Sequence, residues 1–156
     1  MPQKVIPLIS PLPTGHELPR DLLLLADPSW EQVEQYVHAG QCYRAMIEAQ
    51  VVGVIVLMVI SEEVLEIKNI AVAEAWQGKG IGRQLLRHAR KVARADGYFR
   101  LQIATGNSSI GQLALYQQEG FKITHIDKDY FLHHYPEPIF EHGIRCRHRV
   151  VLELVL

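Results

Sequence analysis

The chain has 156 residues, of which 48% are hydrophobic and 21% charged, and its formal net charge at pH 7 is -1. A chain of this length can bury one hydrophobic core, so we expect a single domain over residues 1–156. The balanced charge excludes a general electrostatic attraction to nucleic acid or to an anionic membrane surface.

The cysteines and the apolar segments predict a soluble cytoplasmic protein. Cys42 and Cys146 lie far apart and form no Cys-x-x-Cys motif, which is typical of a reducing compartment. The apolar run over residues 51–60 is too short to cross a membrane. The start of the chain is interrupted by prolines and lacks the apolar centre of a signal peptide.

The first 40 residues predict one strand and one helix. We expect a strand over residues 4–9, followed by a connector rich in Pro and Gly through Pro19. A helix follows, with Asp27 as its cap, Pro28 at the first helical position and Gly40 at its end.

Three β-rich runs follow this helix. Residues 42–50 and 51–60 meet at a short polar stretch, which favours an antiparallel hairpin. Residues 64–72 form a further strand that leads into a glycine-rich turn.

The second half of the chain alternates helices and strands. Apolar residues at helical spacing predict a helix after the glycine-rich turn, closed by Gly97 in a left-handed conformation. A strand over 100–105 then leads to a helix over 110–120, capped by Asn107 or Ser108. The remaining segments are a strand over 121–126, a polar and aromatic loop over 127–143, and a last strand over 144–156.

The glycine-rich turn predicts an anion-binding site. Gly78, Gly80 and Gly82 precede a helix, so unpaired backbone N–H groups and the positive end of the helix dipole would face one point. The alternative is a plain strand-to-helix turn. A dinucleotide fingerprint is excluded because Arg83 replaces its last glycine, and a P-loop because Lys79 is followed by glycine rather than Ser or Thr.

Two segments resemble the GNAT superfamily of N-acetyltransferases. The stretch LEIKNIAVAEAWQGKGIGRQLL contains the pattern Gln/Arg-x-x-Gly-x-Gly/Ala at residues 77–82 and is similar to the family's acetyl-CoA-binding segment. The later stretch LQIATGNSSIGQLALYQQEGF is similar to a second family segment through Asn107, Ala114, Tyr116, Gly120 and Phe121. The resemblance covers about residues 52 to 125.

The resemblance implies an α/β fold with a mixed, mostly antiparallel sheet that is flanked by helices and splayed at the acetyl-CoA-binding strand. It implies transfer of an acetyl group from acetyl-CoA, as co-substrate, directly to a primary amine. No metal is implied. The acceptor is not identified by the sequence and could be a small molecule or a protein.

The resemblance also implies which residues hold acetyl-CoA. The main-chain amides of the turn would hold the pyrophosphate, and the edge of the preceding strand would pair with the pantetheine arm, with the Val72 N–H polarising the thioester carbonyl. The cofactor-binding residues implied are Ile70, Ala71, Val72, Gln77, Gly78, Lys79, Gly80, Ile81, Gly82, Arg83, Asn107 and Tyr116. The Arg83 and Arg87 side chains either reach the ribose phosphate or lie on a solvated basic face.

Tyr116 and Glu66 are the candidate catalytic residues. Tyr116 occupies the position of the family's general acid, which protonates the departing thiolate; the alternative is a core tyrosine. Glu66 lies where some relatives carry a general base, and the alternative is an outward-facing carboxylate paired with Lys68. Asn107 is a helix cap, a hydrogen-bond partner of the cofactor, or both.

The segment after residue 126 contains several histidines. Its His and Cys spacings match no zinc pattern, so we expect no metal site. Tyr130, Tyr135, Glu137 and Glu141 suit an acceptor wall for a cationic amine, although a purely structural loop is the alternative. Neither cysteine lies in a context that activates a thiolate, which favours direct transfer.

Two other functions remain open: a catalytically degenerate CoA-binding regulatory module, and a nucleic-acid binder that uses the basic helix. Intact Tyr116 and Glu66 argue against the first, and the balanced charge argues against the second. The apolar last strand is consistent with pairing across a homodimer or with an internal strand.

Overall fold

A computed structural model describes residues 5–156 and contains a seven-stranded sheet. The strand order across the sheet is β1 (Leu8–Pro11), β2 (Gln41–Ile47), β3 (Gln50–Val59), β4 (Val64–Val72), β5 (Arg100–Gly106), β9 (Arg149–Val155) and β6 (Lys122–Asp127). The β4–β5 pair is parallel and the other neighbouring pairs are antiparallel. This is the mixed, mostly antiparallel sheet that the family resemblance implies.

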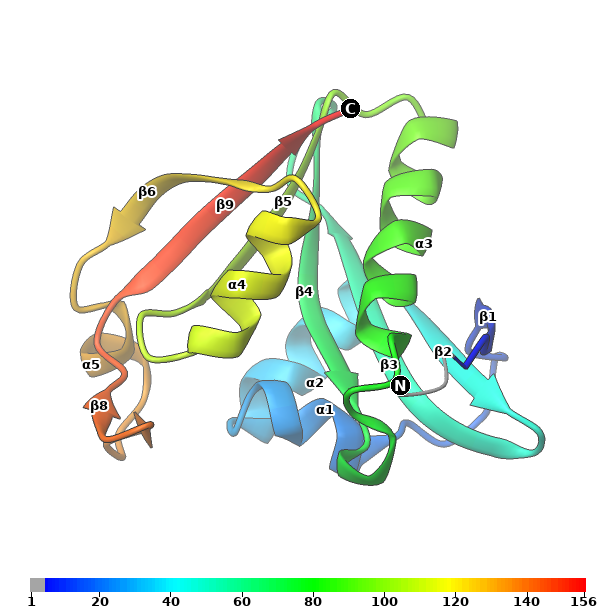
Figure 1. Ribbon diagram of the computed structural model, residues 1–156, viewed down its shortest axis with the longest axis horizontal. Helices are drawn as coiled ribbons and strands as arrows, with labels where there is room; N and C mark the ends of the chain where they lie inside the picture. The colour runs from blue at the N-terminus through cyan, green and yellow to red at the C-terminus, as the bar shows by residue number, and fades with distance from the viewer. Residues whose placement is uncertain (1–4) are drawn as a thin grey trace.

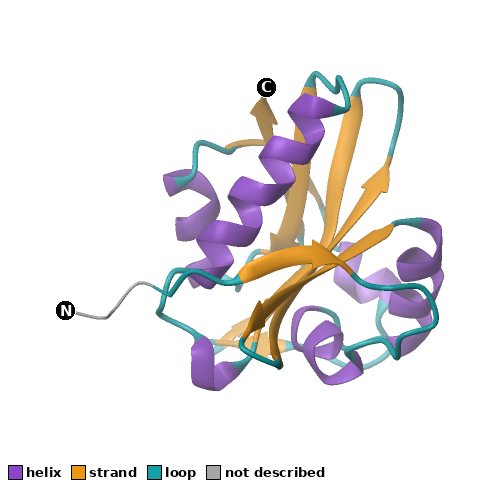
Figure 2. Cartoon of the chain, turned by 90° about the vertical axis from the view of Figure 1, so that its right-hand side faces the viewer, coloured by secondary structure: helices purple, strands orange, loops and turns teal. Residues whose placement is uncertain are grey.

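Helices cover both faces of the sheet (Figures 1 and 2). The helices α3 (Ile81–Ala95) and α4 (Ile110–Gln118) lie on one face, and α1 (Arg20–Ala26) and α2 (Trp30–Ala39) lie on the other. A short 3₁₀ turn, η1 (Glu74–Trp76), precedes the glycines. Helix α5 (Tyr130–His134) and the two-stranded hairpin of β7 (Phe140–Glu141) and β8 (Ile144–Arg145) lie at one end of the sheet.

The alternation of β3 explains why the core has two halves. Ile55 and Leu57 belong to the cluster beneath α3, whereas Val54 and Val56 belong to the cluster beneath α1 and α2. Both faces of this central strand are therefore buried, as its nearly continuous apolar sequence requires.

The sheet is split between β4 and β5 (Figure 1). Their parallel pairing runs from Val64 opposite Arg100 to Ile67 opposite Ile103, and no pair follows. On the other edge of β4 the register shifts, so that Lys68 is an extra residue between two paired positions. A β-bulge increases the local twist of a strand, and here the bulge begins where β4 parts from β5.

The strand over 64–72 and the helix closed by Gly97 are confirmed, with Gly97 at a φ of 82°. The hairpin over 42–60 is also confirmed, and Glu48 in its turn has a φ of 55°. These elements were predictable because β-rich runs, helical spacing and a terminal glycine each favoured the structure that forms.

Four predictions in the N-terminal and C-terminal parts were wrong. The first strand is Leu8–Pro11 rather than residues 4–9. Residue 4 of the predicted range lies outside the described part of the chain. The segment before Asp27 contains α1, which was not predicted because its run of leucines has no helical spacing. The cap of α2 is Ser29, whose Oγ accepts a hydrogen bond from the Gln32 N–H at 3.4 Å. The loop over 127–143 contains α5 and β7.

The last strand is internal. It was predicted over 144–156, but β9 begins at Arg149, and it pairs with β5 on one edge and with β6 on the other. Both edges of β9 are thus occupied, which excludes the pairing of this strand across a homodimer that the sequence left open.

Candidate active site

The edge of β4 that faces the split carries free main-chain groups. The Ala73 N–H donates to the Val52 carbonyl oxygen at 2.8 Å, so alternation directs the N–H groups of Ile70 and Val72 away from β3 and toward the split. The same alternation directs the Ala71 N–H toward β3. Of the three residues proposed for this edge, Ile70 and Val72 can therefore offer donors to an extended ligand.

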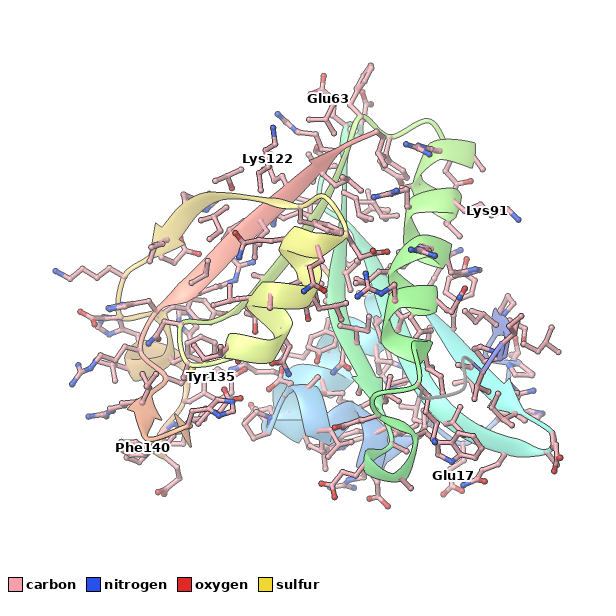
Figure 3. The ribbon with its side chains drawn as sticks, viewed as in Figure 1. Glu17, Glu63, Lys91, Lys122, Tyr135 and Phe140 are labelled. Atoms are coloured by element: carbon pink, nitrogen blue, oxygen red, sulfur yellow. The ribbon has the colours of Figure 1, made fainter. Side chains whose placement is uncertain are left out.

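A cleft of about 740 Å³ occupies the space between the separated strands. Its walls come from β4, β5, α4, the α1–α2 junction and the segment after β6. Tyr135, labelled in Figure 3, belongs to that last segment, and its hydroxyl donates to the side-chain oxygen of Gln32 on α2 at 3.4 Å. The cleft is lined by both apolar and polar side chains and runs beside the free edge of β4, which suits a long substrate.

The glycine-rich turn lies beside the cleft and leaves its amides free. Gly78 and Gly80 have φ values of 75° and 86°, and a side chain at either position would meet no heavy atom within 4 Å. Among residues 5–156, no backbone N–H from Gly78 to Arg83 donates a hydrogen bond to the backbone outside its own helix, and no acidic side chain lies in the first turn of α3. The turn therefore has the geometry of an anion cradle.

Tyr116 lies on α4 and lines the cleft. Its residue exposure is 4%, and its hydroxyl makes no hydrogen bond to any residue between 5 and 156. Burial raises the pKa of the Tyr116 phenol well above its ordinary value, which keeps the proton on the oxygen at neutral pH. The residue can donate a hydrogen bond to a group that enters the cleft.

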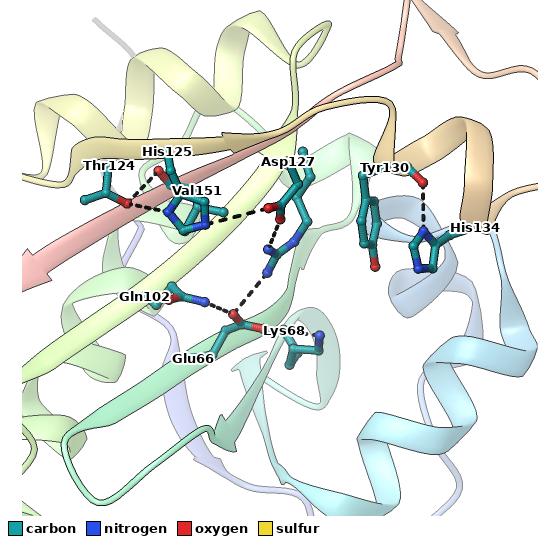
Figure 4. Close-up of polar contacts among 10 residues, drawn as sticks. Glu66, Lys68, Gln102, Thr124, His125, Asp127, Tyr130, His134 and Val151 are labelled. Carbon is teal, nitrogen blue, oxygen red and sulfur yellow. Dashed lines mark hydrogen bonds and ion pairs between the residues drawn. The ribbon is translucent and has the colours of Figure 1, made fainter.

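Glu66 is buried in a network of ion pairs rather than directed outward (Figure 4). One carboxylate oxygen lies 3.2 Å from the Lys68 ammonium. The other accepts hydrogen bonds from Gln102 and, at 3.2 Å, from Arg149. Arg149 also binds Asp127 at 2.7 Å. The alternative interpretation, an outward-facing carboxylate paired with Lys68, is right about the pairing and wrong about the orientation, because Glu66 is buried and lines the cleft.

The basic face of α3 is tied to the end of α4. Arg83 and Arg87 bind the two oxygens of Glu119 at 2.7 and 2.9 Å, and Arg90 donates to the Glu119 carbonyl oxygen at 2.5 Å. Burial tends to raise the pKa of Glu119, but the hydrogen bonds and charges of the two arginines outweigh it and lower that pKa. This face is therefore not simply solvated.

Asn107 does not cap α4. Its side-chain oxygen accepts from the Arg147 and His148 N–H groups at 2.8 and 2.9 Å, and its Nδ2 donates to the Arg145 carbonyl oxygen at 3.2 Å. The cap position is Ser109, and the hydroxyls of Ser108 and Ser109 both donate to Glu141. The side chain of Asn107 thus fixes the segment that leads into β9.

Sequence analysis missed a polar cluster at the α1–α2 junction. Asp27 accepts hydrogen bonds from the hydroxyls of Tyr36 and Tyr135 at 3.2 and 2.8 Å. The Asn69 Nδ2 donates to the same Tyr36 hydroxyl at 2.9 Å. All four residues line the cleft. The sequence predicted a helix cap at Asp27, and only the folded chain brings it to Tyr36 and Tyr135.

The histidines and cysteines do not form a reactive centre in the described structure. Residues 5–156 contain no group of three His, Cys, Asp or Glu side chains arranged to hold a metal ion. Burial raises the pKa of the Cys42 thiol to about 11 and also raises that of Cys146, so both remain protonated at neutral pH.

No helix in residues 5–156 is both long and apolar enough to span a lipid bilayer.

Comparisons with known proteins agree on one family. Residues 38–123 match the model of the acetyltransferase (GNAT) domain. The chain is 51% identical over 136 residues to the uncharacterized N-acetyltransferase YvbK of Bacillus subtilis, covering 87% of this chain and 88% of that protein.

Solved structures show the same fold with ligand bound. One is a GNAT family acetyltransferase from Elizabethkingia anophelis with acetyl-CoA bound, at a TM-score of 0.96 and 48% identity over 98% of this chain and 100% of that chain. Another is a Bacillus subtilis acetyltransferase in complex with CoA, at a TM-score of 0.90 and 46% identity over 96% of this chain and 99% of that chain.

Proposed function

Since this chain belongs to the GNAT family of acetyltransferases, and is thus an acetyl-CoA-dependent N-acetyltransferase, we propose that it transfers the acetyl group directly to a primary amine held in the cleft. The observation that carries this proposal is the split between β4 and β5. It joins a free strand edge, a cradle of amides and a buried phenol in one cleft.

The residues of the cleft suit coenzyme A. The amides of Gly78 to Arg83 would hold the pyrophosphate, because a phosphate can approach the backbone closely where the glycines carry no side chain. Gln77 donates through Nε2 to the Val72 carbonyl oxygen at 3.0 Å, which fixes the turn against the end of β4. The Ile70 and Val72 N–H groups would pair with the amide-bearing arm, and the Val72 N–H would polarise the thioester carbonyl.

In the transfer step, the C–N bond to the amine forms and the C–S bond of the thioester breaks. We propose that Tyr116 donates the proton that the departing sulfur receives. Its hydroxyl is protonated and makes no hydrogen bond to another described residue. The amine must lose a proton to react. Glu66 is our candidate acceptor of that proton, directly or through water, because its carboxylate lines the same cleft.

Two further features support this proposal over the alternatives. The hydroxyl of Tyr116 has no structural partner among the described residues and is therefore available as a proton donor. A degenerate CoA-binding module would not need such a donor. Three of the four arginines of α3 on the basic face that a nucleic-acid binder would use, Arg83, Arg87 and Arg90, are engaged by Glu119. Both cysteines are free thiols, which supports the cytoplasmic setting expected from the sequence.

The variant Tyr116→Phe tests the proposed chemistry. Removal of the hydroxyl should lower kcat by about 100-fold, which is the lower end of the rate contribution of a general acid. The affinity for CoA should stay unchanged. Steady-state acetylation of an amine panel and calorimetric titration with CoA measure the two quantities. Equal turnover by the variant and the wild type would reduce Tyr116 to a packing residue.

A further inference from the structure

The acceptor end of the cleft carries carboxylates that the protein's own cations do not balance. The ionised side chains of the lining are Asp27, Glu66, Glu141, Lys68 and Arg149. Both cations contact Glu66, and Arg149 is shared with Asp127. Within residues 5–156, the ion pairs do not include Asp27 or Glu141. The lining therefore carries two negative charges without a cationic partner.

The partners that these two carboxylates do have are uncharged. Asp27 accepts from two tyrosine hydroxyls and from the Ser29 N–H at 3.1 Å. Glu141 accepts from the hydroxyls of Ser108 and Ser109 at 3.1 and 2.9 Å. Such donors orient a carboxylate and leave its charge in place. Tyr135 reaches Asp27 from the other side of the cleft, so the carboxylate is fixed between two walls.

A second acceptor of hydrogen bonds lies beside Asp27. Asn69 lines the cleft and is 3% exposed, and its side-chain oxygen has no hydrogen-bond partner among residues 5–156. Its Nδ2 is fully used by the Leu23 carbonyl oxygen and the Tyr36 hydroxyl, both at 2.9 Å. A buried oxygen without a donor is unfavourable unless a ligand supplies one.

The aromatic rings of the cleft already face cations. The Lys68 ammonium lies 5.7 Å from the centre of the Tyr36 ring, and the Arg149 guanidinium lies 5.6 Å from that of Tyr130. These two rings are thus engaged by the protein's own cations, and the recognition of a ligand falls to the carboxylates and the unpaired amide oxygen. These acceptors favour a ligand with positive charge and several N–H donors.

We propose that the acceptor carries at least one ammonium group besides the amine that reacts, as a diamine or polyamine does. The second ammonium would bind Asp27 and the Asn69 side-chain oxygen, while the reacting amine reaches the thioester. This inference rests on the proposed transferase function and adds the charge of its acceptor. A monoamine of the same length would leave Asp27 without its cation.

Matched amines test the proposal on the wild-type enzyme. Each straight-chain diamine of three to six carbons is compared with the monoamine of equal length, under saturating acetyl-CoA. For one or more of the diamines, we expect kcat/KM to be at least about tenfold higher than for the monoamine of equal length. One hydrogen bond to a charged group contributes a difference of this size. Equal values for every pair would overturn the inference, and acetylation of no amine would contradict the transferase function itself.

The variant Asp27→Asn assigns the effect to this carboxylate. It should raise KM for the preferred diamine about tenfold, leave kcat/KM for the monoamine unchanged, and leave CoA affinity unchanged. Glu34→Gln, an equal charge change on the exposed face of α2, is the matched control. An equal fall in kcat/KM with the diamine and with the monoamine would mean that Asp27 has only a structural role, and it would overturn the inference. If the variant does not fold, the comparison of amines on the wild type still decides.

Discussion

Tyr116 and Glu66 are both buried in the cleft, but their surroundings differ. The Tyr116 hydroxyl has no partner among the described residues, whereas Glu66 contacts Lys68, Gln102 and Arg149. A group without a partner can turn toward a substrate at little cost. A group that contacts two cations keeps its position, and an incoming amine would compete with them for its oxygens.

Substitution of Glu66 by Gln tests its role as the proton acceptor. We expect the kcat/KM of Glu66→Gln to fall most at low pH, where free amine is scarce and deprotonation limits the rate. The measurement is kcat/KM between pH 6 and pH 9, with the exposed neighbour Glu62→Gln as control. A profile with the same shape as that of the wild type would remove Glu66 as the base.

The residues of the cleft were only partly predictable. Tyr116 and Glu66 were proposed because the family resemblance marks their positions along the chain, and both line the cleft. Asp27 and Asn69 belong to no such pattern, and their meeting depends on how α1 and α2 pack on β4. The predicted helix cap at Asn107 was wrong because an Asn before a helix favours a cap, while the partners of its side chain lie 38 to 41 residues away.

Among the secondary-structure elements, α3 and α4 are linked by the carboxylate of Glu119. Glu119 binds Arg83 and Arg87, so one side chain at the end of α4 fixes two turns of α3. The cradle at the start of α3 and Tyr116 on α4 lie on the two elements that this contact joins. Their relative placement therefore depends on it.

The variant Glu119→Gln should destabilise the protein by about 1.5 kcal/mol, because charge-assisted hydrogen bonds are lost. The arginines lower the folded-state pKa of Glu119, so its contribution is present above its unfolded value and lost as pH falls through the folded value. Urea unfolding of both proteins between pH 7 and pH 3 should show the difference shrinking toward acid. A difference that stays constant would contradict this assignment.

The elements were predictable where local signals agreed and unpredictable where packing decided. The bounds of strand β4 were predicted correctly, since its run is rich in β-forming residues and a glycine-rich turn follows. Helix α1 was missed because leucine fills one whole turn and gives no amphipathic spacing. The last strand was placed too early, since residues 144–148 are as rich in long side chains as β9 itself.

At the scale of the whole molecule, one parallel strand pair creates the site. Antiparallel pairing on both sides closes the rest of the sheet, and β4 and β5 separate after Ile67 and Ile103. The split exposes a strand edge toward the start of α3, where the glycines lie. The central claim is that this edge and the free amides of the turn together bind coenzyme A.

Calorimetric titration with CoA of the wild type, Gly80→Asp and Gly15→Asp tests this claim most directly. Gly80 and Gly15 have φ values of 86° and 82°, and a side chain at either would meet no atom within 4 Å, so both variants carry similar backbone strain. Only Gly80→Asp places a carboxylate in the cradle. We expect it to abolish binding while Gly15→Asp binds as the wild type does; unchanged affinity in Gly80→Asp would contradict the claim.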